Sequence, residues 1–220
     1  MSVCCASSCV APEKIQWSTD GRVKRGDRTL QTTLNGVSTA LEVRSGIYLG
    51  GFKTDAQGIR SSYVVFVPAS LREASGWSFA AAVQGFFQVD DSVHVLLASG
   101  GAFRQSPTGW VESELQFKPD SVVVHTRNGV IACNPVPVAM VSQQRGSCYA
   151  ADGTWSVDVS WREVRPQVCG DEALVVVEQR RDALVAHRIG LKDGRIEATQ
   201  PIDAAPASLC TLQLRALARP

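Results

Sequence analysis

Polar and apolar side chains alternate over residues 154–161. Every second position is large and apolar: Trp155, Val157, Val159 and Trp161. The positions between them carry small or polar side chains. Successive side chains of a β-strand point to opposite faces, whereas a helix would spread these four residues around its surface. The pattern therefore predicts a half-buried antiparallel strand.

Other strands are predicted from apolar runs of strand length. Residues 63–67 are continuously apolar and Pro68 ends the run, which favours a strand covered on both faces. Residues 77–89 are consistent with two short strands or the start of a buried helix, and we favour strands. Alternation at the end of the chain predicts a last strand through Leu212, Leu214 and Ala216.

Five Asn-Gly or Asp-Gly pairs interrupt these runs. Asn and Asp tolerate a positive φ better than other residues with a Cβ, and Gly adopts it freely. A two-residue type I′ turn needs positive φ at both central positions, so these pairs are the strongest short-range signal for a β-hairpin. The predicted turns are Asp20-Gly21, Asn35-Gly36, Asn128-Gly129, Asp152-Gly153 and Asp193-Gly194.

Residues 171–191 fit two different structures. The segment has no Gly or Pro before Gly190, and its apolar residues nearly follow a helical period. However, Val175, Val176 and Val177 are β-branched, and a polar stretch at 179–182 separates two apolar runs of strand length. We predict strand, turn, strand and keep a helix as the alternative.

The predicted architecture is all-β, with an N-terminal arm over residues 1–12 and a single hairpin-rich antiparallel domain over 13–220. The arm is expected to be flexible. Three segments that begin at Asp91, Asp120 and Asp171 share a loose form, an acidic residue followed by a Val-rich hairpin. Recurring hairpins of this kind resemble the blades of a β-propeller. A β-sandwich is nearly as well supported, and an irregular barrel is the third alternative.

Composition limits the classes of partner. Hydrophobic residues make up 45% and charged residues 20% of the 220 residues, as in an ordinary globular protein. The net charge of +1 provides no overall field to attract nucleic acid or an anionic membrane. The chain has no apolar run of the length that a transmembrane helix needs, about 18 residues. We therefore expect neither a nucleic-acid nor a membrane partner.

Source and compartment are inferred from composition and cysteine usage. Arg outnumbers Lys by 17 to 5, which indicates a GC-rich, bacterial genome. Residues 1–12 lack the pattern of a signal peptide, so we predict a cytoplasmic protein, with export after loss of a leader as the alternative. The seven cysteines are an odd number and would stay reduced in the cytoplasm. In an exported protein, Cys133 with Cys148 and Cys169 with Cys210 could bridge neighbouring strands.

Catalytic and metal-binding signatures are missing from the sequence. It contains no nucleophile elbow, phosphate-binding loop, dinucleotide fingerprint or zincin motif. The three histidines, His94, His125 and His187, are far apart and lie within predicted strands, so we interpret them as structural. The closely spaced Cys4, Cys5 and Cys9 lack the usual zinc-ligand spacing. We predict no metal, no cofactor and no catalytic residue.

Two regions are candidates for binding a partner. The first is an acidic stretch in which only Arg104 and Lys118 oppose the carboxylates. The second surrounds Trp161, because Trp and Arg side chains dominate the energetics of protein contacts. The candidate binding residues are Asp90, Asp91, Glu112, Glu114, Asp120, Trp155, Trp161, Arg162 and Arg165.

These observations favour a non-enzymatic protein-binding domain. Its most concrete form is a bacterial immunity or inhibitor protein that neutralises a cognate toxin by occluding its active site, with acidic residues facing a basic substrate-binding surface. The first alternative is a hydrolase of carbohydrates or esters on a β scaffold, marked by two facing carboxylates or by a histidine beside a nucleophile. The second alternative is a structural assembly subunit. The sequence predicts no oligomeric state.

Overall fold

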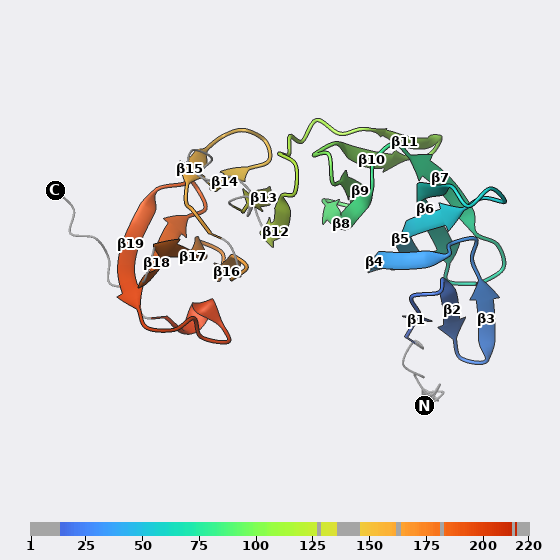
Figure 1. Cartoon of the computed structure of the whole chain (residues 1–220), viewed down its shortest axis with the longest axis horizontal. Helices are drawn as coiled ribbons and strands as arrows, with labels where there is room; N and C mark the ends of the chain where they lie inside the picture. Colours follow the sequence, from blue (N-terminus) through green and yellow to red (C-terminus); the bar gives the residue numbers. More distant parts are fainter. Residues whose placement is uncertain are drawn as a thin grey trace, which may run out of the picture. The chain divides into compact units, whose positions relative to one another are not determined.

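The computed structural model describes residues 14–126, 129–135, 146–161, 164–180, 183–212 and 214. Nearly all regular structure in these residues is β-strand, and the one helical element is the short 3₁₀ helix η1 (Leu209–Thr211). The strands form one three-stranded and four four-stranded antiparallel sheets (Figure 1). The prediction of an all-β, hairpin-rich architecture is thereby confirmed.

The N-terminal sheet and the first four-stranded sheet come first along the chain. The N-terminal sheet has the order β1-β2-β3, and the first meander has the order β4-β5-β6-β7. The bounds are β1 (Gln16–Trp17), β2 (Arg22–Arg25), β3 (Arg28–Gln31), β4 (Gly36–Val43), β5 (Gly46–Thr54), β6 (Arg60–Pro68) and β7 (Ser75–Phe79).

Three further meanders follow, each built from four consecutive strands. The second meander comprises β8 (Val83–Val89), β9 (Ser92–Leu97), β10 (Ala102–Ser106) and β11 (Gly109–Glu112). The third comprises β12 (Val122–Thr126), β13 (Gly129–Asn134), β14 (Ser147–Ala150) and β15 (Ser156–Asp158). The fourth comprises β16 (Gln167–Cys169), β17 (Ala173–Arg180), β18 (Ala183–Gly190) and β19 (Ile196–Ile202).

The four meanders have the topology of β-propeller blades. Each is an up-and-down sheet of four neighbouring strands, and they begin at Gly36, Val83, Val122 and Gln167. Successive starts are therefore about 40–50 residues apart, the spacing of propeller blades. The repeat predicted from Asp91, Asp120 and Asp171 has the wrong phase. Asp91 and Asp171 each precede the second strand of a meander, whereas Asp120 precedes the first strand of the third meander.

The chain divides into two compact units, one ending at Val83 and the other beginning at Gln84. In the first unit, Val23 of the N-terminal sheet packs with Leu49 and Val65 of the first meander. The predicted single domain over residues 13–220 stays a prediction.

In the second unit, the third meander has an apolar core on both of its faces. Val130 packs with Phe87 and Leu96 of the second meander. The next residue, Ile131, points to the other face and packs with Leu174 of the fourth meander. Within this unit, the second, third and fourth meanders thus pack on one another in chain order, as propeller blades do, which favours the propeller-like alternative over a two-sheet sandwich.

The hairpins predicted at Asp20-Gly21, Asn128-Gly129, Asp152-Gly153 and Asp193-Gly194 occur between paired strands. Asn128 lies outside the described residues, and Gly129 is the first residue of β13. The prediction for Asn35-Gly36 is wrong. This pair connects β3 to β4, which belong to different sheets. Gly36 does not have positive φ, and a Cβ there would collide with the ring of Phe52.

The ambiguous segment 171–191 is a hairpin, β17–β18, as predicted. Residues 77–89 likewise contribute to two strands, β7 and β8. The predicted last strand is wrong for Leu212 and Leu214, which follow η1 and pack against the fourth meander without joining a sheet. Ala216 and the predicted arm, residues 1–12, lie outside the described residues.

Candidate functional site

A cleft of about 610 Å³ opens between the third and fourth meanders. One side is formed by the end of the β12–β13 hairpin and by the β14–β15 turn. The other side is formed by the residues before β17 and by the β18–β19 turn. The cleft thus lies where the apolar core between these two sheets ends and their turns begin.

The two Asp-Gly turns orient carboxylates at the cleft. Asp152 Oδ1 accepts hydrogen bonds from the backbone N–H and the hydroxyl of Thr154, at 3.0 and 2.8 Å. Asp193 Oδ1 accepts one from the backbone N–H of Arg195 at 3.1 Å. An Asp side chain that bonds its own turn in this way holds the loop in one conformation. Both carboxylates are therefore fixed at the rim by local structure.

The lining of the cleft carries more negative than positive charge. Among the described residues that line it, the carboxylates are Asp152, Asp171, Glu172, Asp193 and Glu197, and the cation is Lys192. Two arginines just outside the lining form ion pairs with it, Arg188 with Glu197 at 3.0 Å and Arg195 with Asp193 at 3.4 Å. Counting these two and setting aside Asp171, which has a further interaction of its own, the described carboxylates exceed the described cations by one, so the cleft favours a cationic ligand.

Trp155 lines both this cleft and a smaller pocket. Its indole Nε1 donates a hydrogen bond to the carbonyl of Leu191 at 2.9 Å, and Gly194 lies against the ring. The smaller pocket has a volume of about 240 Å³ and is lined also by Phe117, Lys118 and Tyr149. A charged cleft and a mainly apolar pocket are thus neighbours along one surface.

Lys118 is held at the smaller pocket by hydrogen bonds. Its Nζ donates to Ser147 Oγ at 2.7 Å and lies 5.1 Å from the centre of the Tyr149 ring. Its backbone N–H donates to the Tyr149 hydroxyl at 2.6 Å. These contacts attach the segment between the second and third meanders to β14 and give the pocket a fixed cation.

The predicted acidic stretch does not form one patch. Asp90 and Asp91 lie exposed at the tip of the β8–β9 hairpin. Glu112 pairs with Phe103, which pairs with Val95, so Glu112 lies four residues along β9 from Asp91. At 3.3 Å per residue this separation is about 13 Å along the sheet.

The other predicted acidic residues lie toward the end of the meander that carries Glu112. Asp120 is exposed with a positive φ of 58°, and its N–H donates to the carbonyl of Ala98, just after β9. Glu114 is exposed two residues after β11. The meander therefore places Asp90 and Asp91 at one end and the remaining three at the other.

Among the predicted tryptophan and arginine residues that the structure describes, Trp155 lines the cleft and the others do not. Trp161 is 2% exposed within the apolar core between the third and fourth meanders. Arg165 is exposed, and Arg162 lies outside the described residues. The cleft carboxylates were not among the predicted binding residues, although Asp152 and Asp193 were predicted to lie in turns. Their pairing with Gly was the available signal, and it was assigned to the fold alone.

His187 makes hydrogen bonds through both ring nitrogens. Thr199 Oγ1 lies 3.0 Å from Nδ1, and Glu178 Oε2 lies 2.9 Å from Nε2. Burial acts to raise the pKa of Glu178, but the hydrogen bonds from His187 and Arg180 outweigh it and hold that pKa below its ordinary value. The three residues lie on adjacent strands of the fourth meander, and none lines either pocket. This arrangement fits the structural role predicted for His187.

His94 is 4% exposed and stacks on Phe87 with ring centres 4.9 Å apart. Burial lowers the pKa of His94 below its ordinary value of 6.5, and the positive charge of Arg104 lowers it further. Burial also lowers the pKa of His125, and a hydrogen bond with the backbone of Gln88 opposes that effect. Both histidines therefore favour the neutral form in the folded protein.

We expect His94 to make the free energy of unfolding fall as the pH is lowered from about 6.5, because the unfolded chain then binds a proton that the folded protein does not bind. The slope cannot exceed about 1.4 kcal/mol per pH unit, the value for one proton, and it ends below the folded-state pKa. His94→Phe keeps an aromatic ring beside Phe87 but removes the titration. Urea unfolding at pH 7.5 and 5.5 should show a smaller loss for this variant, and equal losses would refute the assignment.

Two disulfides link the pairs that the sequence spacing indicated for an exported protein. Cys133 and Cys148 face each other on β13 and β14, and Cys169 of β16 joins Cys210 of η1. Cys4, Cys5 and Cys9 lie outside the described residues. Within the described ranges, no cluster of three His, Cys, Asp or Glu side chains has a geometry that would hold a metal ion.

The described part of the chain contains no helix with the length and apolar character needed to cross a membrane. Comparison with known proteins identifies no relative: no protein-family model matches the chain, and no curated protein matches its sequence.

Proposed function

We propose that the protein is a non-enzymatic binding protein that takes up a basic segment of a partner protein in the cleft between the third and fourth meanders. The observation that supports this proposal is the excess of carboxylates around a cleft of about 610 Å³. Opposite charge on the partner would speed association and select the partner, while the cleft fixes its position.

The neighbouring pocket indicates which side chains the partner segment would carry. A basic side chain would enter the cleft beside Glu172, and an apolar side chain next to it would contact Phe117 and Trp155 in the smaller pocket. A toxin with a basic substrate-binding surface has this chemistry. Occlusion of such a surface by the acidic cleft is the concrete form of the proposed inhibitory function.

We further propose that the protein acts in an oxidising compartment, which is the export alternative of the sequence analysis. The two disulfides support this compartment over the cytoplasm, where reducing systems keep thiols reduced. Hydrolysis is less well supported than binding. The one histidine beside a hydroxyl and a carboxylate, His187, lies outside both pockets.

The binding proposal is tested with a Lys-rich peptide, a Glu-rich peptide of equal length and two charge variants. Glu172→Gln with Glu197→Gln removes two charges from the cleft, and Asp90→Asn with Asp91→Asn removes two from the β8–β9 tip. We expect calorimetry to detect binding of the Lys-rich peptide and no binding of the Glu-rich peptide. The cleft variant should bind it roughly ten-fold more weakly, about 1.4 kcal/mol, and the tip variant within about two-fold of wild type.

Raised salt should weaken binding to the wild type, because these carboxylates are at the surface. Equal losses in the two variants would contradict the proposal, since they would show attraction by overall charge rather than by the cleft. Tight binding of the Glu-rich peptide would contradict it as well.

A further inference from the structure

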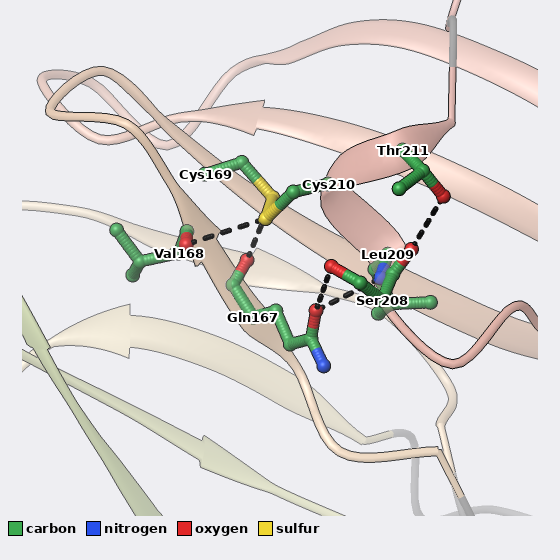
Figure 2. The surroundings of a disulfide bond; sticks show 7 residues. All are labelled: Gln167, Val168, Cys169, Ser208, Leu209, Cys210 and Thr211. Carbon is green, nitrogen blue, oxygen red and sulfur yellow. Dashed lines mark hydrogen bonds between the residues drawn. A yellow bond between two sulfur atoms is a disulfide. The ribbon is translucent and has the colours of Figure 1, made fainter.

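A short C-terminal segment closes one face of the fourth meander. This clip, residues 208–212, contains η1 and lies against the end of β16 (Figure 2). Leu209 is fully buried against Val175, Val177 and Ala186, on the face of the sheet that points away from the third meander. The clip therefore covers apolar surface that belongs to β17 and β18.

One side chain and one disulfide hold the clip to β16. Gln167 Oε1 accepts a hydrogen bond from the backbone N–H of Leu209 at 2.8 Å, and the Ser208 hydroxyl lies 3.5 Å from the same oxygen (Figure 2). The Cys169–Cys210 disulfide is the covalent link, and it closes a sequence separation of 41 residues. Since the clip adds no strand to the sheet, its release breaks no ladder of backbone hydrogen bonds.

The two disulfides differ in their exposure to a reductant. Cys133 and Cys148 are both fully buried within the core between two sheets. Cys210 is exposed and Cys169 is half-buried. Thiol–disulfide exchange requires a thiolate to reach a sulfur atom, so access alone makes the second bond the reactive one.

We propose that Cys169–Cys210 is a reversible modification site for a dithiol reductant, and that its reduction releases the clip from the fourth meander. A thiolate of the reductant attacks Cys210 Sγ, and Cys169 leaves as a thiolate that takes up a proton. The second thiol of the reductant then displaces Cys210, which also leaves with a proton. Two electrons and two protons pass to the protein, and the reductant becomes a disulfide.

Release of the clip changes the surface of the protein. Leu209 leaves Val175 and Val177, and the side chains beside them, Leu184 and Ile202, lose part of their cover. An apolar face of this kind is unfavourable in water. Reduction therefore exposes an apolar surface that can bind other apolar groups, while the hairpin β17–β18 stays paired. The inference does not depend on the cleft or on its proposed partner.

The test begins with the order of reduction in the full wild-type chain. N-Ethylmaleimide first blocks free thiols, dithiothreitol is then applied under native conditions, and a heavy-isotope maleimide marks the thiols that reduction releases. We expect peptide mass spectrometry to find Cys169 and Cys210 labelled at least ten-fold faster than Cys133 and Cys148. Equal rates would overturn the proposal, because they would show that both bonds open by general unfolding.

Hydrogen exchange then tests the release itself. After selective reduction, peptides covering 208–212 should lose at least ten-fold of their protection, while β18 keeps its own. Cys169→Ala with Cys210→Ala should show the same loss without reductant, and the matched Cys133→Ala with Cys148→Ala variant should keep the clip protected. A reduced protein whose clip stays as protected as before would overturn the proposal, whether or not the cleft binds a basic peptide.

Discussion

Gly194→Ala should destabilise the protein by about 2–5 kcal/mol, a large share of the stability of a typical domain. Gly194 has a φ of +68°, and a Cβ there would lie 2.5 Å from Cε3 of Trp155. The left-handed backbone costs alanine about 1–2 kcal/mol, and displacement of the packed ring adds about 1–3 kcal/mol. Urea unfolding followed by tryptophan fluorescence measures the loss.

Gly153→Ala is the matched control for this substitution. Gly153 also follows an Asp in a turn of the cleft, and its φ is +79°, but a Cβ there has no heavy atom within 4 Å. We expect it to lose about 1–2 kcal/mol, the backbone cost alone. The difference between the two variants then measures the contact between residue 194 and Trp155. Equal losses would show that the ring moves away at no cost.

The Asp-Gly turns also show what local sequence can predict. Positive φ is a property of one or two residues, so Asp152-Gly153 and Asp193-Gly194 were identified without any knowledge of the fold. Asn35-Gly36 matches the same turn signature, but its residues have a different structural role. Its Gly leaves room for the ring of Phe52, and the Asn35 side chain accepts a hydrogen bond from the N–H of Thr54 at 2.6 Å. Close approach to a distant strand has no local signal.

The candidate cleft was not predictable for a related reason. Its carboxylates come from Asp152 at one sheet and from Asp171 to Glu197 at the next, and they meet because the two sheets stack. The acidic stretch from Asp90 to Asp120 is dense in sequence, yet its meander runs up and down and separates its members. Charge density along a β chain therefore says little about charge density on its surface.

The burial of side chains was predicted better than their role in binding. Alternation correctly placed Trp155, Val159 and Trp161 on one buried side, although the ladder of β15 covers just Ser156–Asp158. Trp155 and Trp161 were also candidates for contact with a partner. Periodicity reports which side of a strand is apolar, and it cannot distinguish a core from an interface, because both bury the same groups.

The two disulfides should differ in their effect on stability, and in the reverse order of their loop lengths. Loop-closure entropy alone assigns about 3 kcal/mol to the 15-residue separation of Cys133 and Cys148, and about 4 kcal/mol to the 41-residue separation of Cys169 and Cys210. We expect Cys133→Ala with Cys148→Ala to lose about 3–5 kcal/mol, since the buried pair also leaves a small cavity between the sheets.

We expect Cys169→Ala with Cys210→Ala to lose less, about 1–3 kcal/mol, because its clip opens in the folded state. Loss of the disulfide raises the chain entropy of the unfolded protein, which destabilises the folded state. Opening of the clip also raises the chain entropy of the folded protein, and this gain offsets part of the destabilisation. Cys133 and Cys148 allow no such relief, since β13 and β14 stay paired around them until the sheet unfolds. Urea unfolding of both double variants decides the order. A larger loss for the 169–210 pair would show that the clip stays closed without its disulfide.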